Sequence, residues 1–166
     1  MSNLLTEKEF FSQSIAIKKK YLNRELYLHQ YFCQKTRIIP ENVIICQNFI
    51  FFFVENKDYF QAKKHISRLR KTLSKYKIQI IRAEHIFIKL LFSFFPDIYI
   101  HDVHLEFNNK ATHNFVDILL LSYEERGIAI GGKGDYIKVV NEIFNSYIEY
   151  DKQFSPLRIS CKVGGL

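Results

Sequence analysis

The fold is indicated by one short stretch, Ile130-Gly131-Gly132-Lys133-Gly134-Asp135-Tyr136-Ile137, which carries an I-G-x-x-G-x-x-I pattern. Together with Gly127, this stretch holds four of the six glycines of the chain. Glycine tolerates a positive φ and lets another backbone approach closely, so the cluster predicts a tight turn. Apolar residues with helical spacing follow it, namely Ile137, Val140, Ile143, Phe144, Tyr147 and Ile148. A Gly-x-x-Gly turn between two helices directs successive N–H groups outward, which suits a phosphate, and Lys133 adds the countercharge.

The segments on both sides of the turn predict a definite order of elements. Ala83–Phe95 has a helical apolar stripe that stops at Pro96, which cannot continue a helix. Two strand-like runs follow, Tyr99–Phe107 and Phe115–Leu121. After the helix beyond the turn, Leu157–Val163 supplies a last strand. The predicted order is a helix, two strands, two helices around the turn and a final strand, which is an α+β fold.

This arrangement resembles the type II KH domain, whose GXXG loop clamps a short run of nucleic-acid backbone. The resemblance covers residues 83–166, with Gly131-Gly132-Lys133-Gly134 as the loop and Ile130 and Ile137 as its apolar flanks. It implies that these residues contact RNA, with Lys138 and Arg126 beside them. We therefore expect a KH type II-like RNA-binding domain at 83–166, preceded by a basic, mainly helical N-terminal extension at 1–82.

The layout is most similar to the KH domain of the universal small-subunit ribosomal protein number three. Glu125–Gly134 is also similar to the KH domain of the Era GTPase, and Phe95–Ile98 with Val140–Ile143 is similar to the transcription factor NusA. The ribosomal family's basic, Asn-Pro-containing start is missing at Met1–Leu4, and its C-terminal domain is missing after Val163. The resemblance implies a divergent small-subunit ribosomal protein, and a fragmented gene would explain a chain that ends with its KH domain.

Composition favours an organellar setting. Residues with AT-rich codons dominate, because Ile, Lys, Phe, Tyr, Asn and Met total 76, whereas Gly, Ala, Arg and Pro total 21. Mitochondrial, plastid and some reduced bacterial genomes have this bias. Cys33, Cys46 and Cys161 form no C-x-x-C pair, which favours a reducing compartment and argues against disulfides and zinc. We expect a mitochondrially encoded ribosomal protein, or else a protein of the cytoplasm of an AT-rich bacterium.

Positive charge is concentrated in the first half of the chain. The net charge is +7, yet residues 1–82 carry 16 Lys or Arg and 6 Asp or Glu, while residues 83–166 carry 8 and 11. The densest part, Lys63–Lys77, has helical apolar spacing at Ile66, Leu69, Leu73 and Tyr76. Its predicted RNA contacts are Lys63, Lys64, Arg68, Arg70, Lys71 and Lys75. Such a run without an interspersed carboxylate favours a polyanion, with an acidic membrane surface or an acidic protein as alternatives.

The rest of the N-terminal half predicts one further helix and one apolar hairpin. A helix is expected over Thr6–Gln34, with Lys18-Lys19-Lys20 exposed. Val43–Val54 is the longest apolar run, about half the length of a membrane span, and a buried strand or hairpin is expected there. The sequence shows no internal repeat.

Other candidate sites are weaker. Gly127-x-x-x-x-Gly132-Lys133 has P-loop spacing, but Gly134 stands where a Ser or Thr should ligate Mg²⁺. His101 and His104 should point to opposite faces of a strand, so a metal chelate is not expected. Glu124 and Glu125 have no evident partner base. We predict no catalytic residue, cofactor, metal or small-molecule substrate.

The expected function is that of an RNA-binding structural component of a small ribosomal subunit. Its expected partners are rRNA and neighbouring ribosomal proteins, with no membrane. A free-standing Era-like assembly or RNA maturation factor is the first alternative. A degenerate P-loop nucleotide-binding protein is the second.

Overall fold

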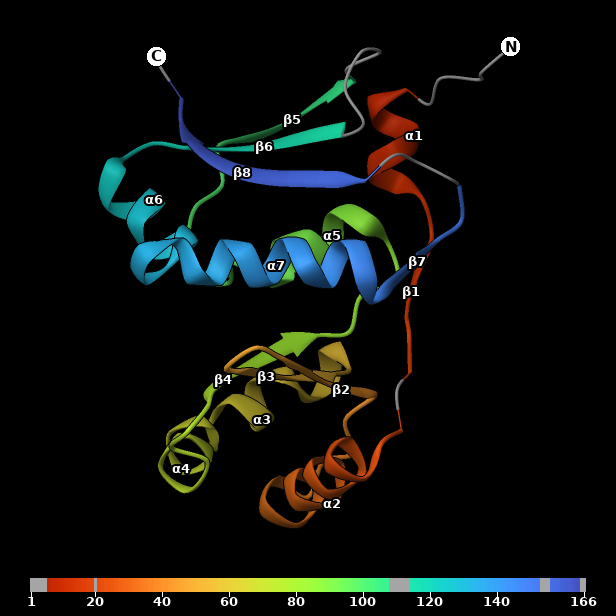
Figure 1. Cartoon of the computed structure of the whole chain (residues 1–166), viewed down its shortest axis with the longest axis vertical. Helices are drawn as coiled ribbons and strands as arrows, with labels where there is room; N and C mark the ends of the chain where they lie inside the picture. The colour runs from red at the N-terminus through yellow and green to blue at the C-terminus, as the bar shows by residue number, and fades with distance from the viewer. Residues whose placement is uncertain (1–5, 20, 108–113, 153–155, 165–166) are drawn as a thin grey trace. The chain divides into compact units, whose positions relative to one another are not determined.

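The computed structural model describes residues 6–19, 21–107, 114–152 and 156–164. Its α+β fold divides into two compact units (Figure 1). We call Met1–Ala16 together with Ile86–Leu166 the glycine-turn unit, and we call Ile17–His85 the inserted unit. Residues 6–16 therefore belong with the C-terminal half of the chain, whereas the sequence-based division groups all of residues 1–82.

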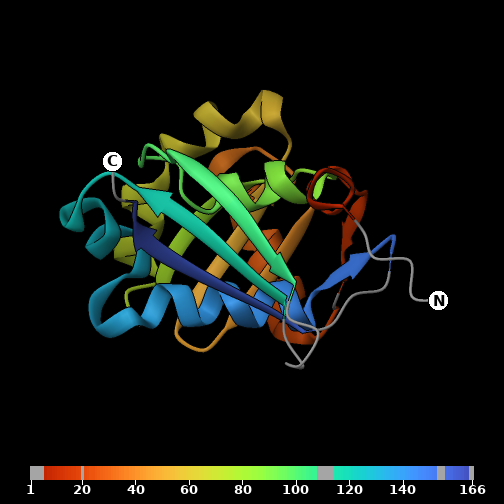
Figure 2. The same ribbon diagram turned by 90° about the horizontal axis from the view of Figure 1, so that it is seen from above.

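The glycine-turn unit is built around a three-stranded sheet. Its elements are α1 (Glu7–Ser12), β1 (Ile15–Ile17, ending one residue beyond the unit), α5 (Phe87–Ser93), β5 (Asp102–Phe107), β6 (Asn114–Leu120), α6 (Tyr123–Ile130), the 3₁₀ turn η2 (Gly132–Gly134), α7 (Asp135–Ser146), β7 (Ile148–Tyr150) and β8 (Leu157–Val163). β5 pairs antiparallel with β6, and β6 pairs parallel with β8. Figure 2 shows these three strands side by side. β1 and β7 form a separate two-stranded sheet.

Four phenylalanines form the aromatic core of the glycine-turn unit. Phe87 from α5 contacts Phe10 from α1, with ring centroids 4.9 Å apart, and Phe144 from α7 at 5.5 Å. Phe94 lies 5.4 Å from Phe144. All four are almost completely buried. Burying a large aromatic side chain stabilises by about 1.5–3 kcal/mol, so this cluster anchors α1, α5 and α7 to one another.

Two asparagines of α7 hydrogen-bond to the free edge of β8. The Asn141 side chain donates to Ile159 O at 2.9 Å and accepts from Ile159 N at 2.7 Å. One helical turn later, Asn145 donates to Leu157 O at 2.7 Å and accepts from Leu157 N at 2.8 Å. Residues four apart on a helix and two apart on a strand have similar spacing, so the two amides replace a neighbouring strand. This pairing locks α7 to the sheet.

The inserted unit has a sheet of its own, which corrects the expectation of a mainly helical extension. Its elements are α2 (Asn23–Thr36), β2 (Asn42–Cys46), β3 (Phe49–Val54), the 3₁₀ turn η1 (Asn56–Asp58), α3 (Tyr59–Lys63), α4 (Ile66–Thr72) and β4 (Lys77–Arg82). β2 pairs antiparallel with β3, and β3 pairs parallel with β4. Over the part of the chain that the structure describes, no helix is both long enough and apolar enough to cross a bilayer.

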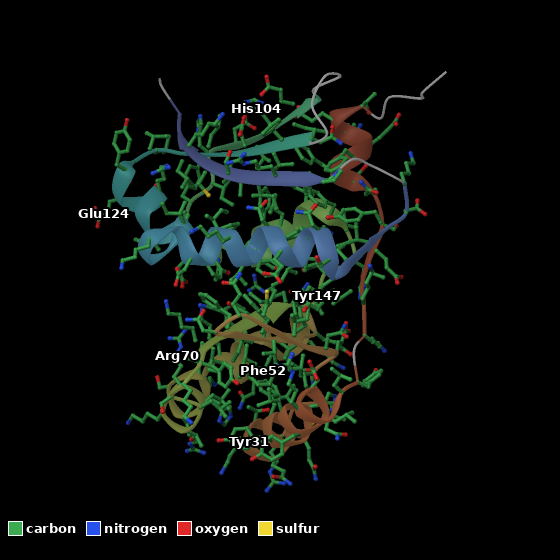
Figure 3. The ribbon with its side chains drawn as sticks, in the orientation of Figure 1. Tyr31, Phe52, Arg70, His104, Glu124 and Tyr147 are labelled. Atoms are coloured by element: carbon green, nitrogen blue, oxygen red, sulfur yellow. The ribbon has the colours of Figure 1, made fainter. Side chains whose placement is uncertain are left out.

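The predicted apolar hairpin is confirmed as β2 and β3, joined at Gln47 and Asn48. Gln47 has a φ of 53°, the left-handed backbone that a two-residue hairpin turn requires. Every residue of β3 is buried, and Phe52 stacks on Phe32 of α2 with centroids 4.5 Å apart (Figure 3). This strand is therefore the centre of the inserted unit's core.

The two units repeat one order of elements, although no repeat is visible in the sequence. Each has a helix, two antiparallel strands, two helices and a strand parallel to the second. The hydrogen bond that closes the parallel strand pair is the same in both units. Ala83 N donates to the O atom of Val54, the last residue of β3, at 2.7 Å, and Gly164 N donates to the O atom of Leu120, the last residue of β6, at 2.9 Å. Each of these donors directly follows the last strand of its unit.

Two expected helices are shorter than predicted. The helix expected over Thr6–Gln34 is interrupted, because Ile15 and Ile17 alternate inward as strand β1, the period that β-branched residues favour. The helix expected over Lys63–Lys77 divides into α3 and α4, and Lys77 already belongs to β4. The other predicted segments appear as α5, β5, β6, α7 and β8, with β8 at the predicted bounds Leu157–Val163.

We predict that Asn141→Ala lowers the free energy of unfolding by about 1–3 kcal/mol, because it leaves two backbone groups of Ile159 without partners. Urea denaturation measures the loss, and faster amide exchange at Ile159 locates it. Lys138→Ala, an exposed change on the same helix, is the control and should stay within about 0.5 kcal/mol of the parent. Equal stability of the two variants would contradict the role given to Asn141.

Candidate nucleic-acid interface

The candidate interface is the turn between α6 and α7. The amide of Gly131 closes the last turn of α6 on Gly127 O at 3.1 Å. Gly131 has φ 79° and ψ 173°, a region open almost exclusively to glycine. Lys133 and Gly134 have φ values of 55° and 71°, and Gly134 N donates to Gly131 O at 3.0 Å. Positive φ values therefore account for Gly131 and Gly134, but not for Gly127 or Gly132.

Glycine is required at Gly131 by space as well as by conformation. A Cβ atom there would lie 2.5 Å from Asp135 Oδ1 and 2.8 Å from Tyr136 Cβ. A Cβ atom at Gly132 or Gly134 would meet nothing within 4 Å. Gly131 is therefore fixed by packing against the first turn of α7, whereas Gly132 is open to substitution.

The apex of the turn is exposed and carries one positive charge. Gly132 and Lys133 are exposed, and the hydrogen bonds that close the turn use the amides of Gly131 and Gly134 instead. The N-terminus of α7 follows directly and adds a partial positive charge. Asp135 opposes it with a carboxylate placed against Gly131. Backbone amides and Lys133 are thus the groups available to an anion here.

The side chains flanking the turn have different environments. Ile130 and Ile137 are half-buried, and Lys138 is exposed. Arg126 Nε donates to Cys161 O on β8 at 2.9 Å, so this guanidinium also fastens α6 to the sheet. Burial raises the pKa of the Cys161 thiol to about 11, and the Arg126 charge offsets only part of that rise. The structure therefore brings together all the residues predicted around the turn but gives Arg126 a structural bond.

The near-match to a P-loop falls on a helix. Gly127 lies inside α6 rather than in a loop that leaves a strand. Glu124 and Glu125 occupy the first turn of that helix, and Figure 3 labels Glu124 there. At the rise of an α-helix this places them about 10 Å along its axis from the glycine turn. Their side chains are thus at the opposite end of α6 from Lys133.

The basic segment of the inserted unit presents a row of exposed cations. Arg68 and Lys71 are three residues apart on α4 and share a helix face. Residues before and after the helix continue this spacing, and we call the exposed set Lys64, Arg68, Lys71 and Lys75 the basic stripe. Arg70 is used differently, because its guanidinium donates to Ile78 O at 3.2 Å. Lys63 Nζ donates to Tyr59 Oη at 3.2 Å.

The turn between α3 and α4 takes the position in the inserted unit that the glycine turn takes in the other. Lys64 and His65 form it with φ values of −61° and −93°, so no residue there is left-handed. The helix before each turn carries a fully buried alanine close to its end, Ala62 in one unit and Ala129 in the other. The inserted unit therefore offers side-chain cations where the glycine-turn unit offers backbone amides.

An aromatic surface next to the basic segment was not predicted from the sequence. The Phe60 side chain on α3 is 70% exposed. The Arg82 guanidinium, at the end of β4, lies 4.1 Å from the ring centroid of Tyr59 and 5.2 Å from that of Phe60. Arginine over an aromatic face gains cation–π energy and holds the ring in place. Sequence patterns do not reveal the contact between Phe60 and Arg82, because these residues are 22 apart along the chain.

His104 on β5 makes a local contact, and His101 directly precedes that strand. His104 Nε2 lies 3.2 Å from Asp102 Oδ2, and both side chains are exposed (Figure 3). Nowhere in residues 6–19, 21–107, 114–152 or 156–164 do three His, Cys, Asp or Glu side chains gather as metal ligands would.

No family model matches the chain, and no curated protein matches it. Among solved structures, it is similar to one titled "Crystal structure of APE1850". The TM-score is 0.61 and the identity 20%, over 86% of this chain and 100% of that chain. The covered share exceeds either unit alone, so the likeness extends into both. At this identity it concerns the fold alone.

We predict that Gly131→Ala destabilises the glycine-turn unit by about 1–3 kcal/mol, because the new Cβ meets Asp135 and the backbone is strained. Thermal and urea unfolding measure the effect. Gly132→Ala is the matched control, and we expect it to change stability by less than about 1 kcal/mol. Similar losses in both variants would contradict the special role given to Gly131.

Proposed function

We propose that the chain binds RNA through the glycine turn and the basic stripe, and that it acts by positioning RNA rather than by chemistry. The observation that carries the proposal is the conformation of Gly131–Gly134, a left-handed turn between two helices with an exposed apex. The surrounding order of a helix, two strands, two helices and a strand agrees with that of a type II KH domain. Such domains hold nucleic-acid backbone at a GXXG loop.

At the glycine turn, the proposed contact is with a phosphodiester. The exposed residues Gly132 and Lys133 form the apex, and the N-terminus of α7 follows it. Backbone N–H groups and a lysine at such a place favour an anion. Lys138 lies one turn further along α7 and extends the positive surface. Ile130 and Ile137, both half-buried, supply an apolar floor beside the phosphate.

In the inserted unit, the proposed contact is made by side chains. The unit carries 15 Lys or Arg and 5 Asp or Glu, a net charge of +10. The basic stripe presents four of these cations to solvent. Phe60, held by Arg82, adds a face on which a base can stack, a contact worth about 1–3 kcal/mol per base.

For the biological setting, we propose a small ribosomal subunit, organellar or of an AT-rich bacterium. This part of the proposal rests on composition and on the resemblance to ribosomal protein number three. The Era-like alternative gives a different distribution in a sucrose gradient of the native extract. A structural component stays with mature subunits at high salt, whereas an assembly factor leaves them.

We expect the double variant Gly132→Asp/Lys133→Asp to bind single-stranded RNA oligomers at least about tenfold more weakly, because two carboxylates at the apex repel a phosphate. Fluorescence anisotropy against a labelled random-sequence pool measures affinity, and circular dichroism verifies the fold. Unchanged affinity of the folded variant would remove the glycine turn from the interface.

The triple variant Arg68→Gln/Lys71→Gln/Lys75→Gln should lower the slope of log affinity against log salt by about 2, at roughly 0.7 per contact on single strands. The control Lys8→Gln/Lys57→Gln/Lys89→Gln removes the same charge from exposed positions outside the basic stripe. Equal slopes for the two variants would show that the basic stripe acts only through net charge.

A further inference from the structure

A polar pair lies next to the aromatic surface of the inserted unit. Asn56 Nδ2, in η1, donates to Glu84 Oε1, just beyond β4, at 2.7 Å. Two residues before Glu84, the Arg82 guanidinium lies 5.2 Å from the ring centroid of Phe60 on α3. Two contacts therefore join the η1–α3 stretch to the end of β4. The proposed RNA contacts use the ring of Phe60 and leave the polar pair without a task.

The end of the β3–β4 pair fixes where Glu84 lies. The two strands are parallel, with Val54 opposite Arg82, so two residues further Asn56 and Glu84 face each other. Their hydrogen bond follows from this register. Glu84 N also donates to Arg82 O at 3.0 Å, and Ala83 N donates to Val54 O at 2.7 Å. Glu84, which is half-buried, is thus held through both its backbone and its side chain.

Asn56, Phe60 and Lys64 share one face of the helical stretch. They follow one another at intervals of four residues, and the backbone stays right-handed from η1 through α3 to Lys64. Residues four apart on such a stretch are neighbours, with Cβ atoms about 6 Å apart. All three residues are exposed, Phe60 at 70%. The row therefore presents, in order, the amide that holds Glu84, an aromatic ring and a cation.

This row matches the parts of one nucleotide. A base stacks on an exposed aromatic ring, and a phosphate pairs with a cation. The Arg82 guanidinium lies 4.1 Å from the ring centroid of Tyr59, closer than to that of Phe60, so it leaves most of the Phe60 ring accessible. The Glu84 carboxylate repels phosphate. A nucleotide stacked on Phe60 therefore directs its phosphate towards Lys64 and the edge of its base towards Glu84.

The carboxylate discriminates among the bases. It accepts hydrogen bonds and donates none. Guanine has two adjacent donors on its Watson–Crick edge, N1–H and the N2 amino group, which one carboxylate can accept together. Adenine and cytosine place an acceptor next to their amino group, and uracil has a single N–H between two carbonyl oxygens. Hydrogen bonds to an ionised acceptor are stronger than those between neutral groups, so guanine gains most.

We propose that Phe60, Glu84 and Lys64 form a subsite for one unpaired guanine nucleotide of single-stranded RNA. The base stacks on Phe60, the Glu84 carboxylate accepts from guanine N1–H and N2–H, and Lys64 meets the phosphate. Asn56 holds the carboxylate in place. The subsite rests on the RNA binding proposed above and deepens it, because the glycine turn and the basic stripe contact backbone and read no base.

The test measures the affinity of the full chain for labelled oligouridines that differ in one central nucleotide. Fluorescence anisotropy compares guanosine, inosine, adenosine and cytidine at that position. We expect the guanosine oligomer to bind about tenfold more tightly than the adenosine or cytidine oligomer, because only guanine supplies two donors to the carboxylate. Inosine lacks only the N2 amino group, and its oligomer should lie between them.

Glu84→Gln should remove most of the preference for guanosine, while Glu55→Gln, an exposed change of the same charge in the same unit, should keep it. The Gly132→Asp/Lys133→Asp variant should weaken the binding of all four oligomers and keep their order, which separates this subsite from the glycine turn. If Glu84→Gln does not fold, the four oligomers on the parent chain still decide.

Equal affinity of the parent for the four oligomers, or an unchanged preference in folded Glu84→Gln, would overturn the guanine subsite and leave the proposed RNA binding intact. Failure of the parent to bind any oligomer would overturn both. Displacement of the guanosine oligomer by an equal concentration of free GMP would assign the subsite to a free nucleotide and overturn the commitment to RNA.

Discussion

The parallel pairing of β6 with β8 is the constraint on which the glycine-turn unit depends. A strand reaches a parallel neighbour only if the chain leaves one end of the sheet and returns to the other, which a tight hairpin cannot do. α6 and α7 make this return. Near the C-terminal end of α7, Asn141 and Asn145 hydrogen-bond to Ile159 and Leu157, at the start of β8. The turn between the two helices is consequently held at a fixed place beside the sheet. Its position comes from the crossover, and its conformation comes from its glycines.

The same constraint operates in the inserted unit with a shorter chain. Between the paired residues Val54 and Arg82 the crossover consists of η1, α3 and α4, and α4 has 7 residues where α7 has 12. The turn between α3 and α4 is built without a left-handed residue, so it exposes side chains rather than a bare backbone. One topology thus produces two turns in equivalent places with different chemistry. We suggest that this difference divides the work of RNA binding between backbone amides and cationic side chains.

Electrostatics reinforces that division. The inserted unit has a net charge of +10, whereas the glycine-turn unit has 9 Lys or Arg and 12 Asp or Glu, a net charge of −3. In the RNA complex that we propose, a phosphate at the glycine turn would be held locally, by Lys133 and the start of α7, against Asp135. A phosphate at the basic stripe benefits from the charge of the whole unit.

The sequence by itself determined the elements whose signal is local. The glycine spacing identified the turn, the apolar run Val43–Val54 identified the hairpin, and the alternation in Leu157–Val163 identified β8 at its observed bounds. Periodicity and turn chemistry depend on near neighbours, which is why these segments could be predicted. The KH hypothesis and its RNA contacts also came from such local signals, and they stay predictions.

Only the tertiary structure decided which distant residues meet. Ile78, Ile80 and Ile81 sit at the end of a basic run that suggested a helix, yet they form β4 because β3 offers a parallel partner. The division of the basic cations into an exposed stripe and an internally bonded Arg70 depends on where Ile78 O lies. The repeated order of elements is likewise invisible in the sequence, because many different apolar residues can fill the same core positions. Burial of Glu25 follows from the packing of α2 against β2, which no pattern within α2 encodes.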